Sequence, residues 1–241
     1  RGDFRKMEKS TASVTVICSN YNSAKWIDGY LRNINNQLLA EFDIIFVDAN
    51  STDGSLQTIK DVQFREGINK TVVESEKRIT VYEAWNDAIK IAKTPYIINL
   101  NTDDRLYPTG LLTYLNYAKV NPSVDIFYGS CVVCEDADHQ RITGINQWPE
   151  YSHETLLKMC IGGPFPMVKR SSLVEDGLFD PSFSISGDYE MWLRMSKKGR
   201  EFFKVVEPVG SYYRNPEGVS TNPTGMPEHI RQDTKMREMH K

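Results

Sequence analysis

Polar residues follow three apolar segments of the chain, and the most reactive of them are carboxylates. Asp103 and Asp104 are adjacent and follow PYIINL, Asp48 follows FDIIFV, and the run SNYN from Ser19 to Asn22 follows SVTVIC. Two like charges held side by side destabilise a fold unless a cation lies between them, so Asp103 and Asp104 predict a divalent metal site. Ser19, Asn22 and the residues from Ser51 to Asp53, taken alone, are explained at least as well as turn or helix-cap residues.

The segments around these residues alternate between strand and helix. Short β-branched apolar runs predict strands, and apolar residues three or four apart predict helices. The predicted order is strand 12–18, helix 22–39, strand 42–47, a helix to residue 64, strand 68–74, a helix capped by Thr80 and Glu83, strand 95–100, helix 108–119 and strand 125–134. This alternation indicates an α/β fold with a mostly parallel central sheet and helices on both faces. Ligands of such sheets bind beyond the carboxyl ends of the strands, so all three polar segments should share one edge.

The alternation stops after about Cys134. A polar loop follows, and helices are expected near 153–159 and, most clearly, at 186–198. The polar tail 220–241 contains the amphipathic stretch EHIRQDTKMREMH, which we interpret as a solvated closing helix rather than a membrane or acceptor contact.

The composition is that of a globular protein. The 241 residues include 29 Lys and Arg against 32 Asp and Glu, for a net charge of −3. The absence of a Lys/Arg-dense stripe argues against nucleic acid as a partner, and no apolar run reaches the roughly 20 residues that cross a bilayer. We expect a cytoplasmic protein that could contact a membrane peripherally. The sequence does not indicate its oligomeric state. We expect one domain, 1–241, with halves 1–134 and 135–241, which is compatible with a place in a longer chain.

The cysteines and histidines form no motif that predicts a metal site. Cys131 and Cys134 make a C-x-x-C within a predicted strand, where positions three apart point to opposite faces, and His139 is the only nearby third ligand. We expect reduced, packed thiols. The chain also contains no G-x-G-x-x-G, G-x-x-x-x-G-K-[ST] or G-x-S-x-G motif. What remains is a site that holds a nucleotide through side-chain carboxylates and a diphosphate through a divalent metal.

Five segments between about Ser13 and Tyr213 carry a family resemblance. They are SVTVICSNYN, IIFVDANSTDGS, ESEKRITVYEAWNDAIKIAKTPYI, INLNTDDRLYP and GLFDPSFSISGDYEMWLRMSKKG. In these segments the chain resembles the inverting, GT-A-fold glycosyltransferases of family 2. IIFVDANSTDGS is similar to V-V-D-D-G-S-T-D-G-S, INLNTDD to the D-x-D metal motif, and SGDYEMWLR to the E-D-Y-D-L-W-L-R segment that holds the catalytic base. These motifs are specific for the superfamily and say little about the substrate.

The resemblance implies a metal-dependent enzyme that moves a sugar, with inversion, from a nucleoside diphosphate sugar to a hydroxyl of a glycan or glycolipid. A UDP-sugar is the leading donor candidate. The implied site residues are Asp188 as general base, Ser19, Tyr21, Asp48, Glu76 and Asp103 on the donor, and Asp103 and Asp104 on Mn²⁺ or Mg²⁺. Asp48 would accept from the uracil ring N–H, while Asp103 would hold ribose hydroxyls or the metal. Glu76 and Trp85 are weaker candidates, and Trp85 is better explained as a core residue.

Asp188 lies at the start of the predicted helix 186–198. The free N–H groups and dipole of that helix should keep its carboxylate ionised at neutral pH. Glu190 is the runner-up base, but it is better explained as a salt-bridge partner.

The chain departs from the family pattern in several places. Ser19 replaces a Pro, Ala49 and Asn50 replace Asp-Gly, Arg78 stands where a carboxylate is common, Asn101 replaces the first Asp of D-x-D, and Gly187 replaces the Glu before the base. Two alternatives stay open. A sugar nucleotidyltransferase would need a Gly-rich, basic loop after the first strand, and SNYNSAK is neither. A non-catalytic carbohydrate-binding domain with a degenerate donor site would not need the intact Asp188, Asp103 and Asp104.

Overall fold

The computed structural model describes residues 12–218 and 221–240. Its first half contains β1 (Val14–Asn20), α1 (Ala24–Asn35), β2 (Phe42–Asp48), α2 (Ser55–Asp61), β3 (Ile68–Glu74), α3 (Val81–Ile91), β4 (Tyr96–Asn99), β5 (Arg105–Leu106), α4 (Gly110–Val120) and β6 (Ile126–Cys134). The second half contains β7 (Ile142–Asn146), α5 (His153–Lys158), β8 (Met167–Lys169), α6 (Arg170–Glu175), α7 (Gly187–Lys197), β9 (Phe202–Tyr213) and α8 (Met226–His240). Every strand and helix that the sequence predicts is therefore present.

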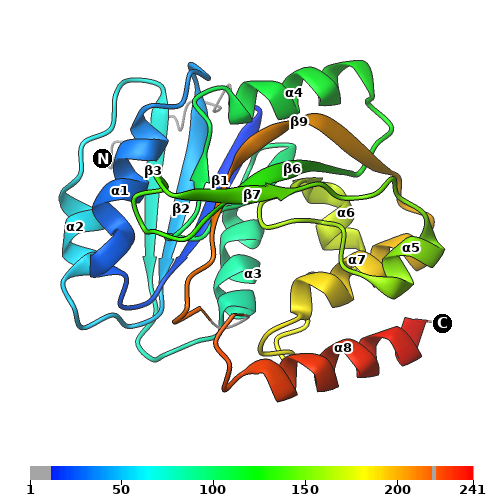
Figure 1. The fold of residues 1–241 in the computed structure, drawn as a ribbon. Coiled ribbons are helices and arrows are strands. Elements are labelled where there is room, and N and C mark those ends of the chain that lie inside the picture. Colours follow the sequence, from blue (N-terminus) through cyan, green and yellow to red (C-terminus); the bar gives the residue numbers. More distant parts are fainter. Residues whose placement is uncertain (1–11, 219–220, 241) are drawn as a thin grey trace, which may run out of the picture.

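One sheet runs through both halves of the chain (Figure 1). Its strand order is β3-β2-β1-β4-β8-β6-β9-β5, and β7 pairs with β6 outside this path. The first four of these strands are parallel, as is the pair β6 and β9. The short strand β8 runs antiparallel to both of its neighbours, β4 and β6. The complete sheet is therefore mixed, with parallel and antiparallel pairs.

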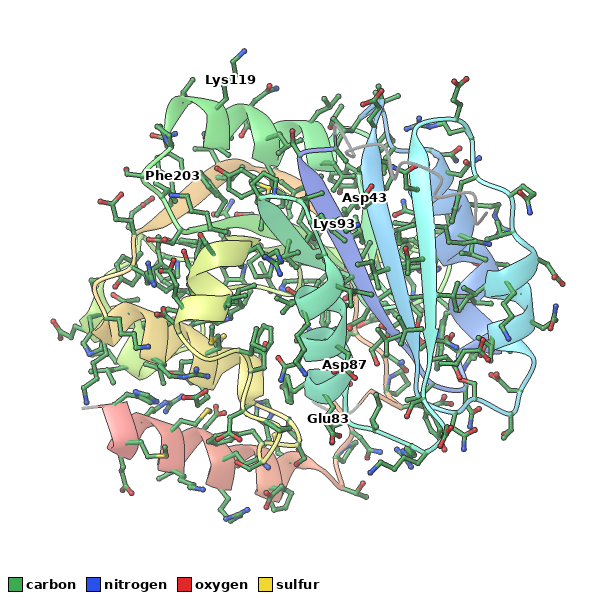
Figure 2. The ribbon with its side chains drawn as sticks, turned by 180° about the vertical axis from the view of Figure 1, so that it is seen from behind. Asp43, Glu83, Asp87, Lys93, Lys119 and Phe203 are labelled. Carbon is green, nitrogen blue, oxygen red and sulfur yellow. The ribbon has the colours of Figure 1, made fainter. Side chains whose placement is uncertain are left out.

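The two faces of the sheet are separate apolar layers because successive side chains of a strand alternate between faces. In β2, Phe42, Ile44 and Phe46 pack in one core cluster with α1, α2 and α4. Ile45 and Val47 pack in the other cluster, with α3 and the helices of the second half. Figures 1 and 2 show α1 and α3 on opposite faces of the sheet, and Figure 2 marks Glu83 and Asp87 on α3. The α/β fold with helices on both faces is confirmed.

Helix α3 starts where the sequence predicts it. The side chain of Thr80 accepts from the backbone N–H of Glu83, and the Glu83 carboxylate accepts from the N–H of Thr80. Trp85 of this helix is 4% exposed and packs edge-on against Tyr82 and Phe179, as expected of a core residue.

The sequence did not predict β5, β7, β8, β9 or α6. Strand β9 is long, but Pro208 and a register shift against β6 interrupt it, so it lacks a continuous apolar pattern. Within residues 12–218 and 221–240, no helix combines the length and the apolar character that a bilayer crossing needs.

Candidate active site

The carboxyl ends of β1 and β2 form a hydrogen-bonded polar corner. Asn20 and Asp48 are register partners, and Asn20 Nδ2 donates to Asp48 Oδ1 over 2.5 Å. The backbone N–H of Ser51 donates to Asp48 Oδ2 over 2.9 Å, and Asn20 Nδ2 also reaches the hydroxyls of Ser51 and Ser55. Asp48 is 1% exposed, so its carboxylate organises this corner. The predicted contact with a uracil N–H stays a prediction, and it requires that this side chain become accessible.

The two loops after β1 and β2 are tied to each other. Asn22 has a left-handed φ of 47°, its N–H donates to Ser51 Oγ over 3.0 Å, and its Oδ1 accepts from the N–H of Thr52 over 2.8 Å. Asp53 Oδ2 accepts from the N–H of Ala24 over 2.7 Å. The turn and cap roles that the sequence offered for these residues are therefore observed, and they give the corner a fixed shape.

Three of the expected donor-binding residues lie around this corner. Ser19 is half-buried at the end of β1, and Tyr21 is 40% exposed in the loop after it. The guanidinium of Arg78 lies 4.3 Å from the centre of the Tyr21 ring, at a cation–π distance. Glu76 is exposed in the same β3–α3 connection as Arg78. The structure thus joins Tyr21 to Arg78, a residue that the sequence singled out only as a departure from the family pattern.

Asp103 and Asp104 differ strongly in their surroundings. Asp103 is half-buried, and its Oδ2 accepts from Asn215 Nδ2 over 2.9 Å. Asp104 is 1% exposed, and its Oδ1 is buried without a hydrogen-bond partner. Burial, with the charge of Asp103 as the second cause, raises the pKa of Asp104 well above its usual range, and Arg105 partly opposes this shift. Burial therefore disfavours the ionised form of Asp104, and a cation bound beside it would favour that form.

Two residues that the sequence did not assign to the site hold this segment. Asn215 follows β9 and binds the Asp103 carboxylate, as described above. His139 lies in the turn between β6 and β7 with a left-handed φ of 57°, and its ring joins the carbonyl oxygen of Asp103 (2.9 Å) to Ser211 Oγ of β9 (2.6 Å). No pattern in the sequence pointed to either residue, because both reach Asp103 across the sheet.

The donor set at Asp103 and Asp104 fits a divalent cation that is shared with a ligand. Carboxylate oxygens suit Mg²⁺ and Mn²⁺, and Mg²⁺ is usually held by one or two carboxylates together with substrate phosphates. The unpartnered, buried Oδ1 of Asp104 is consistent with this chemistry. In the part of the chain that the structure describes, no three His, Cys, Asp or Glu side chains form a complete metal site. The protein alone would therefore supply an incomplete ligand set.

Asp188 lies in the first turn of α7 beside α3. Tyr82 Oη of α3 donates to the carbonyl oxygen of Ile185 over 2.5 Å and lies 3.3 Å from Asp188 Oδ1. Because α3 follows β3, this contact brings the carboxylate to the side of the sheet where the strands carrying Asp48 and Asp103 end. The contact joins the two halves of the chain at the residue expected to act as base.

Two opposing effects set the electrostatics of Asp188. Burial disfavours the charged form and raises the pKa of this carboxyl, whereas the helix N–H groups of Asp188 and Tyr189, the Tyr82 hydroxyl and the nearby His229 lower it. Desolvation is the larger effect, so the helix N-terminus offsets it only in part, and ionisation of Asp188 at neutral pH stays a prediction. A raised pKa favours proton uptake.

Glu190, the alternative base, is occupied elsewhere. It is 4% exposed, its Oε2 lies 2.7 Å from Arg194 Nη2, and its Oε1 lies 3.2 Å from His240 Nε2 of α8. The expectation of a salt-bridge partner is confirmed.

The cysteines agree with the expectation of reduced, packed thiols. Cys131 and Cys134 are free and buried, and burial raises the pKa of the Cys131 thiol to about 12.

The mostly parallel sheet with helices on both faces is the GT-A architecture. The model of the family described as Glycosyl transferase family 2 matches residues 15–173, and the chain belongs to this family. It is therefore a glycosyltransferase.

The chain is also similar to curated proteins. The chain is 26% identical to chondroitin synthase of Escherichia coli over 91% of its length, and 34% identical to poly(ribitol-phosphate) beta-glucosyltransferase of Bacillus spizizenii over 83%. It spans 32% and 35% of those two proteins.

Solved structures show the same fold. S. aureus TarS 1–349 in complex with UDP-GlcNAc matches with a TM-score of 0.76 at 18% identity, over 95% of this chain and 66% of that one. Mannosyltransferase PcManGT from Pyrobaculum calidifontis, in complex with GDP-Man and Mn²⁺, matches with a TM-score of 0.72 at 18% identity, over 95% of this chain and 67% of that one.

Proposed function

We propose that this chain is a metal-dependent, inverting glycosyltransferase that moves a sugar from a UDP-sugar to a hydroxyl of a glycan or glycolipid. The observation that carries the proposal is the setting of Asp188. It is a carboxylate at a helix N-terminus, held against Tyr82, with a pKa raised by burial. Such a group suits proton abstraction near neutral pH.

The reaction is a single displacement. The acceptor hydroxyl gives its proton to the Asp188 carboxylate while its oxygen attacks the anomeric carbon, and the bond from that carbon to the diphosphate oxygen breaks. The nucleoside diphosphate leaves with the electron pair of that bond. Because attack comes from the face opposite the leaving group, the configuration inverts.

The donor would lie along the carboxyl edge of the first four strands. Asp103 and Asp104 would hold Mn²⁺ or Mg²⁺, which would neutralise the charge that develops on the leaving diphosphate. Tyr21 and Arg78 offer a flat, cationic surface beside the β1–β2 corner that suits a nucleobase and its ribose. The two ligands in the TarS and PcManGT complexes, UDP-GlcNAc and GDP-Man, set the choice of donors to be tested.

A thermal-shift panel of nucleoside diphosphate sugars with Mn²⁺ tests the donor. A ligand at 100 times its dissociation constant stabilises the folded state by about 2.7 kcal/mol, so a specific donor should raise the melting temperature by several degrees. UDP-sugars should exceed GDP-mannose. If no nucleoside diphosphate sugar stabilises the protein with Mn²⁺ present, the proposal is wrong.

Asp188→Asn tests the base. It should leave UDP-sugar affinity within a few-fold and lower transfer by at least about a hundredfold, the typical scale of general-base loss. Glu190→Gln is the matched control, assayed at a temperature where both variants are folded, and it should retain transfer. Wild-type transfer in Asp188→Asn together with an inactive Glu190→Gln would move the base to Glu190.

Two assays separate the alternatives. Release of UDP from the selected UDP-sugar in water alone identifies a competent catalytic site and excludes a purely carbohydrate-binding domain. Formation of a UDP-sugar from UTP and a sugar 1-phosphate would instead identify a sugar nucleotidyltransferase.

A further inference from the structure

Helix α8 packs beside α7 (Figure 1). It carries Gln232, whose side-chain amide contacts the segment that precedes α7. Gln232 is 4% exposed. Its Oε1 accepts from three consecutive backbone N–H groups, those of Ser184 and Ile185 at 3.2 Å and that of Ser186 at 3.4 Å. These three residues end two positions before Asp188.

The rest of the Gln232 amide is also engaged. Its Nε2 donates to Ser184 Oγ over 2.8 Å and to Glu228 Oε1 over 2.6 Å. The neighbouring Asp233 accepts from Ser186 Oγ over 2.7 Å. One turn of α8 therefore binds both the backbone and the side chains of residues 184–186.

The segment 184–186 lies just before α7, and its N–H groups are outside the hydrogen-bond pattern of that helix. The N–H groups at the start of a helix have no intrahelical partner and are usually satisfied by the side chain of the N-cap residue. Ser186 is the N-cap of α7, but its side chain makes no capping hydrogen bond to α7 because its hydroxyl is donated to Asp233. Gln232 binds the N–H groups just before the helix instead. On the α3 side, Tyr82 holds the carbonyl oxygen of Ile185.

We infer that Gln232 is a positioning residue for Asp188, since it fixes residues 184–186 between α8 and α3 and so fixes the first turn of α7. The inference rests on the proposed function, in which Asp188 takes the acceptor's proton. It makes α8, which the sequence offered only as a solvated closing helix, a supporting part of the catalytic site.

Hydrogen exchange of the peptide that covers residues 184–188 tests the contact without any substrate. Gln232→Met keeps the length of the side chain but removes the acceptor, and it should speed exchange of this peptide by about tenfold or more. Met236→Ala is the matched control, because Met236 is fully buried on the same helix and belongs to the apolar core. Unchanged exchange in Gln232→Met, or equal acceleration in Met236→Ala, would overturn the inference.

Turnover separates positioning from general stability. With the donor selected by the panel, Gln232→Met should lower kcat for UDP release by between about tenfold and a hundredfold, the scale of a small misplacement of a catalytic group, with KM for the donor within a few-fold. Met236→Ala should retain kcat.

A double variant distinguishes this inference from the proposed function. If Gln232 acts through Asp188, Gln232→Met should cost little further activity in the Asp188→Asn background. An equal loss in both backgrounds would refute the positioning role and leave the function intact. A wild-type rate in Asp188→Asn alone would instead refute the assignment of the base.

Discussion

The ring of Tyr82 lies directly against the backbone of Gly187. A Cβ atom at position 187 would meet three ring carbons of Tyr82 at 2.8–2.9 Å, closer than such contacts occur. This approach lets the Tyr82 hydroxyl reach both Ile185 and Asp188. It also gives a physical reason for the absence of the Glu that precedes the base in the family motif, because a side chain there would collide with the ring.

Gly187→Ala should therefore displace Tyr82 or the start of α7. We expect a loss of about 1–3 kcal/mol in the free energy of unfolding, typical of overpacking, and a kcat at least about tenfold lower. Urea unfolding and UDP release measure the two effects. Gly144→Ala is the control, since a Cβ at Gly144 has no neighbour within 4 Å, and it should change stability by less than about 0.5 kcal/mol. If Gly187→Ala and Gly144→Ala change the free energy of unfolding and kcat equally, the close contact between Gly187 and Tyr82 determines neither quantity.

The raised pKa of Asp188 predicts a pH dependence of turnover. A base must be deprotonated, so kcat should rise with pH through the pKa of this carboxyl. The Tyr82 hydroxyl stabilises the ionised form and lowers that pKa, so Tyr82→Phe should move the acid limb of the profile to higher pH. Tyr114→Phe removes a buried hydroxyl that donates to Phe165 on the other core cluster, and it should leave the limb in place. A downward shift in Tyr82→Phe would contradict the assignment.

The same pKa predicts how Asp188 affects stability. Since its folded-state pKa is raised above the unfolded value, the folded protein binds more protons between these two values. The contribution of this carboxyl to stability therefore falls as pH rises through that window. Asp188→Asn should melt at a higher temperature than the wild type at pH 8, and the difference should narrow toward pH 4. Thermal unfolding without donor or metal measures this difference. If Asp188→Asn melts at a lower temperature than the wild type at pH 8, the ionised Asp188 carboxylate does not destabilise the fold.

The sequence predicted the parallel part of the fold because its signals are local. The strands β1, β2 and β4 are short apolar runs, and Thr80 with Glu83 forms a cap within four residues. Strand β8 has three residues, and β9 is interrupted by a proline and a register shift, so only pairing across the sheet defines them.

The residues of the candidate site also differ in whether their signal is local in the sequence. Asp48, Asp103 and Asp104 follow strands along the chain, so the sequence could find them. Asn215, His139 and Gln232 act on residues 36 to 112 positions away, and such contacts leave no local pattern. The burial of Asp188, which raises the pKa of its carboxyl, also left no local pattern, since it depends on elements distant in the sequence.

Donor binding should depend on a divalent ion. Chelation of divalent ions should weaken UDP affinity by at least about tenfold, because a metal held by Asp103 and Asp104 would neutralise the diphosphate. Asp103→Asn and Asp104→Asn should show the same loss with Mn²⁺ present. Asp138→Asn alters an exposed carboxylate of the nearby β6–β7 turn and is the control. Calorimetric titration with UDP measures all four proteins, and unchanged affinity after chelation and in both site variants would remove the metal from the mechanism.

His139 should support the same site through the carbonyl oxygen of Asp103. Its left-handed backbone lets the ring bridge Asp103 and Ser211, so losing the ring frees the Asp103 segment from β9. His139→Asn retains a residue that tolerates this backbone but cannot span both contacts, and it should weaken Mn²⁺-dependent UDP binding by about tenfold, the scale of a lost outer-shell partner. His153→Asn, which removes a ring bound to Ser196 between α5 and α7, should stay within about twofold. Wild-type affinity in His139→Asn would show that Asn215 alone suffices to hold Asp103.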